Sequence, residues 1–515
     1  MIVLTKVFRN TYRDSVLLMK MASKVRSIDG VENAEVMVAT GPNKAILCQT
    51  PLFTDEAKGA GPNDLVICVM AEDEEVAKKA IHDAEEMVMR GTVSEETGQV
   101  ARSLNSALAL LPGANLAILS IPGLYVKKEA LKALKKGLNL LVFSDNVPVE
   151  DEIEIKRFAA GAGLLVMGPD CGTAILQGAA LAFANKVRKG SIGLVGASGT
   201  GLQEVSVQIH HLGMGISHAI GTGTNDVSNR VGGLTMIQGI KWLEADPATE
   251  SIIIVSKPPA RATMEKVLIE LRQCRKPVIA NFLGAYKKSF AERGTLFTVT
   301  LEETALEATE RMGRPSSTKA GLEGVEEALA RAKQETMNLN DGQKYIRGLF
   351  SGGTLATEAC IVLGEKVSSL SGNISLSGVR KLTNARKSEG HSIIDLGADE
   401  FTLGKPHPMI EPEMRKERLL AEAKDPEVAV VLLDFVLGYG AHHDPVGATI
   451  PYLERMREIA REGGRPISIV ASVCGTDEDP QNRSSQVRLL EEHGVIVLPN
   501  NAQAARAAAL IALRA

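Results

Sequence analysis

The chain has 515 residues, a formal net charge of −4 and only 3% aromatic residues. The near balance of charges excludes a polybasic protein that binds nucleic acid or a membrane surface. The scarcity of aromatic side chains argues against a base-stacking surface, whereas 48 glycines are typical of α/β folds in which the backbone binds phosphate. At about 150 residues per domain, this length predicts three or four domains.

The first predicted unit is a small α+β module. Apolar runs predict strands over residues 2–9, 32–40 and 64–71, and amphipathic patterns predict helices over 15–28 and 72–90. The first charged side chain is Lys6, and the residues around it do not form the apolar segment that a signal peptide needs. No apolar run reaches the roughly 18 residues that a membrane helix needs. We therefore expect a cytoplasmic protein with no membrane or nucleic-acid partner.

The rest of the chain alternates short apolar strands with helices, which predicts parallel sheets buried on both faces. A stretch rich in Gly, Lys and Glu, with the composition of a linker that carries one helix, interrupts this pattern. The fold class is therefore multidomain α/β. The predicted parts are 1–100, 101–190, 191–313, the linker 314–345, and 346–515.

Three strand–turn–helix junctions have the composition of an anion site, because glycines let the backbone approach a ligand and helix N-termini favour negative charge. None contains a P-loop or a G-x-G-x-x-G motif. The alternative, that Gly and Thr only form turns and caps, stays open for each junction. The junctions are Ser198, Gly199 and Thr200; Cys474, Gly475 and Thr476; and, as weaker candidates, Gly352, Gly353 and Thr354.

Other reactive side chains give weaker signals. Lys257 ends a predicted parallel strand, where a lysine often faces the ligand crevice. His442, His443 and Asp444 have a metal-like composition, but further ligands cannot be placed, so we predict no metal centre. The six cysteines form no C-x-x-C pair, which favours free thiols.

Several motifs together resemble succinyl-CoA synthetase rearranged into one chain. They are MGPDCG (167–172), GLVGASGTGLQE (193–204), SGGTLATEA (351–359) and VASVCGT (470–476). Residues 116–190 and 191–312 resemble the two domains of the α-subunit, and residues 346–515 resemble the carboxy-terminal domain of the β-subunit. With its opening VFRNTYRDSVLLMKMA (7–22), the fusion is similar to the FdrA family. The resemblance implies a Rossmann-like CoA-binding-type domain at 101–190 and flavodoxin-like domains at 191–313 and 346–515.

The chain also departs from succinyl-CoA synthetase. The stretch that carries the phosphohistidine in that enzyme corresponds to residues 281–294, which contain no histidine. The glutamate that orients the phosphohistidine aligns with Lys257, and no ATP-grasp domain precedes the β-like part. These departures argue against ATP-dependent thioester synthesis.

The resemblance to FdrA proteins implies one component of an oxamate carbamoyltransferase in allantoin degradation. Such a complex converts oxalurate and phosphate to oxamate and carbamoyl phosphate, together with partner subunits, and a homodimer is a further expected assembly. The turns at Ser198–Thr200 and Cys474–Thr476 would bind phosphate from opposite sides, and Lys257 would neutralise its charge or polarise the carbamoyl oxygen. Asp170 and Cys171 would line the crevice, with Cys171 a candidate nucleophile.

Two alternatives stay open. One is an acyl-CoA synthetase-like ligase with CoA as its cofactor, bound by loops that resemble CoA-contacting segments at Pro122, Ser144, Asp145 and Val147. The other is a non-catalytic subunit that uses an inherited fold. The carbamoyltransferase hypothesis requires no cofactor. A measurement of CoA binding therefore distinguishes it from the ligase hypothesis.

Overall fold

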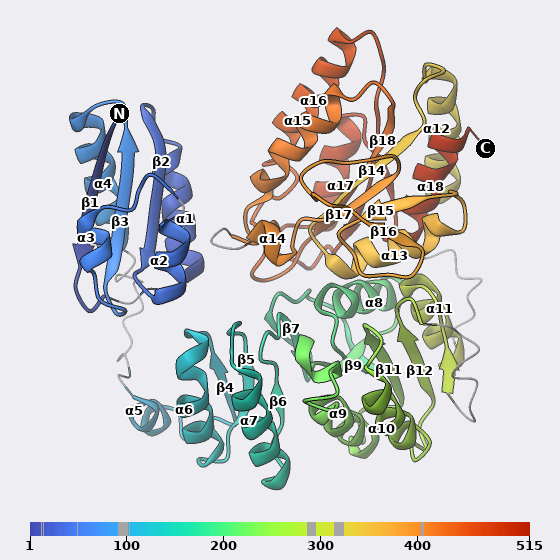
Figure 1. Ribbon diagram of the computed structural model, residues 1–515. Helices are drawn as coiled ribbons and strands as arrows, with labels where there is room; N and C mark the ends of the chain where they lie inside the picture. Colours follow the sequence, from blue (N-terminus) through green and yellow to red (C-terminus); the bar gives the residue numbers. More distant parts are fainter. Residues whose placement is uncertain are drawn as a thin grey trace. The chain divides into compact units, whose positions relative to one another are not determined.

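The chain forms two compact units in the computed structural model (Figure 1). Unit 1 comprises Met1–Gly113 with Asp399–His407, and unit 2 comprises Ala114–Ala398 with Pro408–Ala515. The structure describes residues 1–11, 13, 15–48, 50–90, 101, 103–285, 295–313, 324–402 and 406–514.

Unit 1 is built on a three-stranded antiparallel sheet of order β1-β3-β2. Alternate residues of the central strand β3 point to opposite faces, so Ile67 and Val69 pack under helices α1 and α4, while Val66 and Cys68 pack under α2 and α3. Both faces of the sheet are therefore buried. The elements are β1 (Ile2–Phe8), α1 (Ser15–Arg26), β2 (Val31–Val38), α2 (Gly41–Leu47), α3 (Asp55–Gly59), β3 (Leu65–Ala71), α4 (Glu74–Arg90), α5 (Leu104–Leu110) and α14 (Asp399–Thr402).

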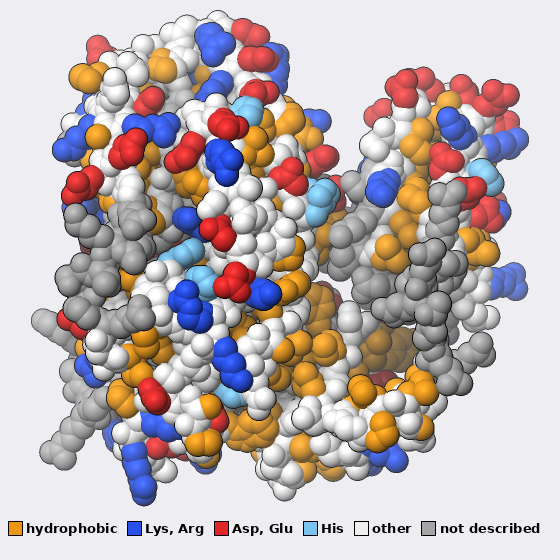
Figure 2. All heavy atoms as spheres, turned by 180° about the vertical axis from the view of Figure 1, so that it is seen from behind, with side chains coloured by type: hydrophobic (Ala, Val, Ile, Leu, Met, Phe, Trp, Pro, Cys, Tyr) orange, Lys and Arg blue, Asp and Glu red, His pale blue; other side chains and the backbone are white. Residues whose placement is uncertain are grey.

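Acidic side chains gather at one end of unit 1 (Figure 2). They lie where β3 passes into α4 and where β2 begins, and all are exposed: Asp29, Glu32, Glu72, Asp73, Glu74 and Glu75. These carboxylates are therefore solvated.

Unit 2 begins with a three-stranded parallel sheet of order β4-β5-β6. The crossover helices α6 and α7 connect its strands in the βαβ manner that the sequence predicts. The elements are β4 (Leu116–Leu119), α6 (Gly123–Leu134), β5 (Asn139–Val142), α7 (Val149–Gly161) and β6 (Val166–Met167).

A seven-stranded sheet follows, of order β13-β12-β11-β9-β10-β7-β8. The interior strand β11, between β12 and β9, has the sequence SIIIVS and is buried at every position, which explains its clear signal in the sequence. The elements are β7 (Thr173–Leu176), β8 (Ala179–Ala182), β9 (Lys189–Gly196), α8 (Gly199–His211), β10 (Ile216–Gly221), the 3-10 turn η1 (Thr224–Val227), α9 (Leu234–Ala245), β11 (Ser251–Ser256), α10 (Arg261–Leu271), β12 (Val278–Phe282), β13 (Thr295–Phe297) and α11 (Leu301–Arg311).

The hairpin β7–β8 belongs to this second sheet and not to the first. β7 pairs antiparallel with β10, with Leu176 opposite His218. A boundary at residue 190 therefore cuts through a continuous sheet, because hairpin pairing across a domain border leaves no clear trace in hydrophobic pattern.

The third sheet of unit 2 has seven parallel strands in the order β16-β15-β17-β14-β18-β19-β20. Helix α12 (Val325–Asn338) lies in the predicted linker and precedes it. The elements are β14 (Tyr345–Phe350), α13 (Gly353–Gly364), β15 (Leu370–Gly372), β16 (Val379–Lys381), β17 (Ser392–Asp395), the 3-10 turn η3 (Pro412–Arg415), α15 (Lys416–Lys424), β18 (Val428–Val436), α16 (Ile450–Glu462), β19 (Ser468–Cys474), α17 (Arg483–Glu492), β20 (Ile496–Leu498) and α18 (Asn501–Leu513).

One hydrophobic core joins the two seven-stranded sheets. It includes Leu194 of the first sheet, Leu432 of the second, and Leu202, Leu355 and Ala505 from helices α8, α13 and α18 between them. In Figure 1, α8 and α13 lie where the green and the orange parts of unit 2 meet. The regions predicted as separate domains, 191–313 and 346–515, are thus packed as one body.

A buried ion cluster ties the three-stranded sheet to its neighbour. The Lys156 Nζ of α7 lies 2.8 Å from Glu152 Oε1 and 2.8 Å from Asp226 Oδ1, and it donates to the Thr222 carbonyl oxygen. Asp226 also accepts hydrogen bonds from the backbone at the start of α9. The two carboxylates thus share one lysine, and N–H groups of the backbone and of Asn225 supply the remaining hydrogen bonds. Among the described helices, none has both the length and the apolar character that crossing a bilayer requires.

Candidate functional site

The N-terminus of α8 lies at the interface between the two seven-stranded sheets. Strand β9 ends at Gly196, and α8 begins at Gly199 with Ser198 as the N-cap residue. The Ser198 side chain makes no capping hydrogen bond, because its Oγ lies 2.7 Å from Thr354 Oγ1. The first turn of α8 therefore presents backbone N–H groups that its own N-cap side chain does not satisfy.

The N-terminus of α13 faces α8 but already has a carboxylate. Asp434 of strand β18 accepts hydrogen bonds from the backbone N–H groups of Ser351 and Gly352, each at 2.7 Å. The guanidinium of Arg415, itself buried, pairs with Asp434 and donates to Ser351 Oγ at 2.9 Å. A buried carboxylate thus lies beside the N-cap residue of α13, where it would repel an external anion, although α13 itself, like α8, has no side-chain cap.

Glycines allow the two helix ends to touch. A Cβ atom on Gly201 would lie 2.2 Å from Ser198 Oγ and 2.9 Å from Thr354 Cγ2, and one on Gly352 would lie 3.1 Å from Thr200 Oγ1. A Cβ atom on Gly353 would lie 2.5 Å from Asp395 Oδ2. The structure therefore brings the first and third predicted junctions together, with three hydroxyl groups at the contact.

The second predicted junction is not at this contact. Gly475 lies at the opposite end of α8, where its carbonyl oxygen is 3.0 Å from His211 Nε2. The Thr476 N–H donates to Asp479 and its Oγ1 donates to the Lys186 carbonyl oxygen, and Thr476 is fully buried. The prediction that Cys474, Gly475 and Thr476 oppose Ser198–Thr200 is wrong, because their polar groups are used in packing the two sheets together.

Lys257 lies at the same edge as the Ser198 turn. It directly follows β11, which pairs in parallel with β9, and its side chain is exposed. A flexible cation at this position is able to approach an anion held at the start of α8.

Asp170 and Cys171 follow β6, at the carboxyl edge of the three-stranded sheet. Asp170 is exposed, and its Oδ2 accepts a hydrogen bond from Thr224 Oγ1 at 2.9 Å. Cys171 is buried, its thiol lies 3.4 Å from two carbonyl oxygens, and burial raises its pKa to about 12. The thiolate that a nucleophile needs is therefore not formed at neutral pH, which contradicts the predicted role of Cys171.

The loops with CoA-like motifs do come together. Pro122 is the N-cap residue of α6, and Ser144 Oγ accepts a hydrogen bond from the neighbouring Ile121 N–H at 2.9 Å. A Cβ atom on Gly123 would lie only 2.3 Å from the carbonyl oxygen of Asn146, so these loops are in direct contact. Asp145 is exposed and Val147 is buried beside them. All four predicted residues lie at the carboxyl ends of β4 and β5, where α/β sheets bind ligands.

Asp434, Asp395, Ser351 and Arg415 were not predicted from the sequence. Asp434 does leave a signal, because it is the one charged residue in the strand VAVVLLDFV, and a carboxylate buried in an apolar strand needs partners. Arg415 lies in an irregular segment that shows no comparable pattern.

The metal-like side chains do not assemble a centre. Among the described residues, no three His, Cys, Asp or Glu side chains are grouped closely enough to hold a metal ion. The rings of His442 and His443 lie 4.4 Å apart, and His442 Nδ1 accepts a hydrogen bond from the Asp444 N–H.

Three family models match the chain. A model described as AllF, heavy metal-associated domain, matches residues 1–103, a CoA binding domain matches 187–282, and a CoA-ligase matches 349–511. The CoA-binding match falls on β9 to β12, and not on the region 101–190 that the resemblance assigned to CoA.

Over 490 residues the chain is 44% identical to a protein of Escherichia coli K12 described as uncharacterized protein YahF, and the alignment covers 95% of this chain and 94% of YahF. The chain belongs to the YahF family. A more distant relative is the α-subunit of the ADP-forming succinate–CoA ligase of Methanothermobacter thermautotrophicus, 27% identical over 33% of this chain and 58% of that subunit. Another is the sulfoacetate-CoA ligase subunit SauD of Bilophila wadsworthia, 28% identical over 33% of this chain and 59% of SauD.

Two solved structures are similar to the chain at low identity and low TM-score. A dinucleotide-forming acetyl-coenzyme A synthetase of Ca. Korarchaeum cryptofilum, in complex with phosphate and ADP, is 16% identical with a TM-score of 0.28, covering 78% of this chain and 83% of that one. PH0766 from Pyrococcus horikoshii is 15% identical with a TM-score of 0.32, covering 81% and 87%. With the family models and the parallel sheets, the predicted α/β fold class is confirmed, and this member of the YahF family is succinyl-CoA synthetase-like, with CoA-binding and CoA-ligase regions.

The description of the first model raises the question of a heavy metal in unit 1. The cysteines there are Cys48 and Cys68, and burial raises the pKa of the Cys68 thiol to about 11. Cys68 lies within β3 and accepts a hydrogen bond from Thr5 Oγ1. These residues do not fit a heavy-metal site, which needs accessible thiolates close together.

Proposed function

We propose that the chain is a CoA-binding, CoA-ligase-like protein that transfers an acyl group between phosphate and CoA. The observation that carries this proposal is the α8 N-terminus. Its first-turn N–H groups are not capped, and the hydroxyl groups of Ser198, Thr200 and Thr354 lie beside them. This is the arrangement that holds a phosphate group.

The proposed roles follow from position. The first turn of α8 and the hydroxyl groups bind the phosphoryl oxygens of an acyl phosphate, and Lys257 neutralises their charge. The loops at Pro122, Ser144, Asp145 and Val147 hold CoA, which supplies the thiol acceptor. A carbon–sulfur bond forms as the carbon–oxygen bond to phosphate breaks, and the thiol proton leaves with the phosphate. Asp170, which follows β6 at the same edge of the sheet, orients the acceptor.

This proposal is tested with acetyl phosphate and CoA. We expect CoA to bind in titration calorimetry and the protein to form acetyl-CoA, with thioester formation reduced at least tenfold in Thr200→Val and Thr354→Val. The matched control is Thr357→Val, one turn further along α13, where the hydroxyl group donates to the Gly353 carbonyl oxygen instead. Absence of saturable CoA binding would overturn the proposal.

A second candidate is the carbamoyltransferase component implied by the FdrA resemblance. Two observations favour it: the match of residues 1–103 to an AllF domain model, and the lack of histidine in residues 281–294, of which 286–294 lie outside the described residues. In this reaction phosphate bound at α8 attacks the carbamoyl carbon of oxalurate. The carbon–nitrogen bond breaks, the amide nitrogen takes a proton, and oxamate and carbamoyl phosphate form without CoA or ATP.

The second candidate also requires partner subunits or a second copy of the chain. The purified chain, alone and with its partner proteins, is incubated with oxalurate and phosphate, and carbamoyl phosphate is measured. If the complete complex makes none, this candidate is eliminated. If the complex forms carbamoyl phosphate in the absence of CoA, the carbamoyltransferase function replaces the proposed acyl transfer to CoA.

A further inference from the structure

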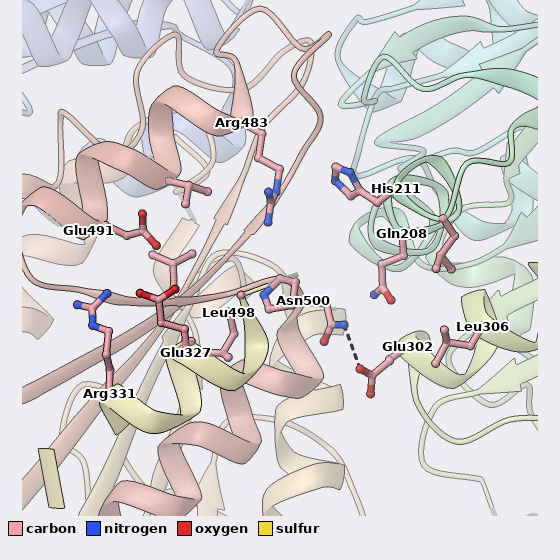
Figure 3. A pocket seen from close by; sticks show the side chains of 16 residues that line it. Gln208, His211, Glu302, Leu306, Glu327, Arg331, Arg483, Glu491, Leu498 and Asn500 are labelled. Carbon is pink, nitrogen blue, oxygen red and sulfur yellow. Dashed lines mark hydrogen bonds between the residues drawn. The ribbon is translucent and has the colours of Figure 1, made fainter. Parts of the chain in front are cut away.

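A pocket lies at the other end of α8, away from the candidate site. It has a volume of about 520 Å³, within the range of small-molecule sites. Its walls come from the last turns of α8, from α11 and α12, from α17, and from the turn between β20 and α18 (Figure 3). Since α8 has 13 residues, its two ends are about 18 Å apart, so the pocket is separate from the Ser198 turn.

Arg483 provides a fixed cation in this pocket. Its Nε donates to the Val473 carbonyl oxygen at 3.2 Å, and this is the one hydrogen bond that its guanidinium makes within the described part of the chain. The bond sets the orientation of the head group, and Figure 3 shows the guanidinium directed into the pocket. The two terminal nitrogens form a planar fork that matches a carboxylate.

His211 lies beside Arg483 at the pocket but carries no charge (Figure 3). Its Nε2 lies 3.0 Å from the Gly475 carbonyl oxygen, which can only accept, so Nε2 holds the proton. Burial, with the nearby charge of Arg483, lowers the pKa of His211 to about 4. The imidazole is therefore neutral at physiological pH, and Arg483 is the cation on this side of the pocket.

The opposite wall is mixed in charge. Glu327 and Arg331 of α12 and Glu491 of α17 line it together (Figure 3). Glu302 also lines the pocket, but Asn500, Gln503 and Arg506 all donate to it, so its charge is compensated. The wall thus offers carboxylates that accept hydrogen bonds from N–H groups of a ligand.

We propose that this pocket binds a small carboxylic acid that also carries an amino group, with its carboxylate on Arg483 and its ammonium group toward Glu327 and Glu491. An amino acid has this pattern. The ligand would contact the last turn of α8, whose first turn forms the candidate site. The inference does not depend on the proposed function, because no residue is shared between the two sites.

The test is thermal unfolding of the full chain with each of the standard L-amino acids at millimolar concentration, and with acetate and inorganic phosphate. We expect at least one amino acid to raise the melting temperature, with a response reduced at least tenfold in apparent affinity by Arg483→Met. Arg488→Met is the matched control, since Arg488 is exposed on the same helix and does not line the pocket.

If Arg483→Met does not fold, Glu491→Gln provides a second test of the proposal. Glu491 is exposed, so its substitution does not disturb the fold. It should weaken amino-acid binding and leave the fold intact. A lack of response to every amino acid would overturn the proposal. A response to acetate or phosphate of the same size, unaffected by Glu491→Gln, would also overturn it, since the ammonium group would then play no part.

Discussion

At the scale of single residues, one buried carboxylate decides which helix end is available to an external anion. Neither helix has a side-chain cap, but the Asp434 carboxylate accepts from the N–H groups of Ser351 and Gly352 just before α13, whereas Ser198 at α8 pairs with the neutral hydroxyl group of Thr354. Two facing helix ends therefore do not make a symmetrical anion site. The anion-binding role falls to α8.

Asp434→Asn should destabilise the chain strongly. The neutral amide leaves the buried guanidinium of Arg415 without its carboxylate partner, and breaking a buried ion pair in this way costs about 3–5 kcal/mol of unfolding free energy. Urea denaturation measures the loss. Asp341→Asn, at a fully exposed position, should change stability by less than about 0.5 kcal/mol. Equal stability of the two variants would contradict the assigned role of Asp434.

Glu358 should make stability depend on pH. Its side chain is fully buried and accepts from the Leu301 N–H and from Asn501 Nδ2. Burial, with the nearby carboxyl of Glu204, raises the pKa of Glu358 from 4.5 to about 7. Between these values the folded chain keeps a proton that the unfolded chain has lost. The free energy of unfolding therefore falls as the pH rises through this window.

Glu358→Gln removes this titration. As the pH rises from 5 to 8, the free energy of unfolding of the variant should increase relative to that of the parent chain, by roughly 3 kcal/mol in total. Urea melts at several pH values measure the difference, and taking the difference cancels the titration of other groups such as His211. A difference that stays constant with pH would rule out the raised pKa.

At the scale of elements, the contact between α8 and α13 depends on the small size of Gly201. A methyl group there would collide with Ser198 Oγ and with the Thr354 side chain. Gly201→Ala should therefore cost about 1–3 kcal/mol of unfolding free energy and lower activity at the candidate site. Gly364→Ala, in the last turn of α13, has open space around it and should be neutral or slightly stabilising. Calorimetry of both variants checks the contrast, and equal effects would contradict it.

The helices and strands could be predicted from the sequence more easily than the tertiary contacts between them. Strands such as β11 and β18 are long apolar runs, and such runs mark buried parallel strands directly in the sequence. The pairing of Ser198 with Thr354, instead of with the Thr476 turn, could not be predicted. All three turns have the same local composition, and only packing decides which of them meet. The same holds for Arg415, which meets Asp434 through the tertiary fold.

At the scale of the whole molecule, the chain divides into two units with separate cores. We expect unit 1 to unfold independently of unit 2, because each buries its own apolar surface. Differential scanning calorimetry of the full chain should then show two transitions. The destabilising variant Asp434→Asn should move only the transition of unit 2. One transition, shifted as a whole, would contradict the division.

Within unit 2, the packing of two seven-stranded sheets around one core makes their association independent of protein concentration. The α-like and β-like halves are covalently joined, so they meet at an effective concentration that does not change when the protein is diluted, typically in the millimolar range for short connections. An interface formed between separate subunits would dissociate at low concentration. Here the start of α8 meets α13 in every molecule, however few molecules a cell contains.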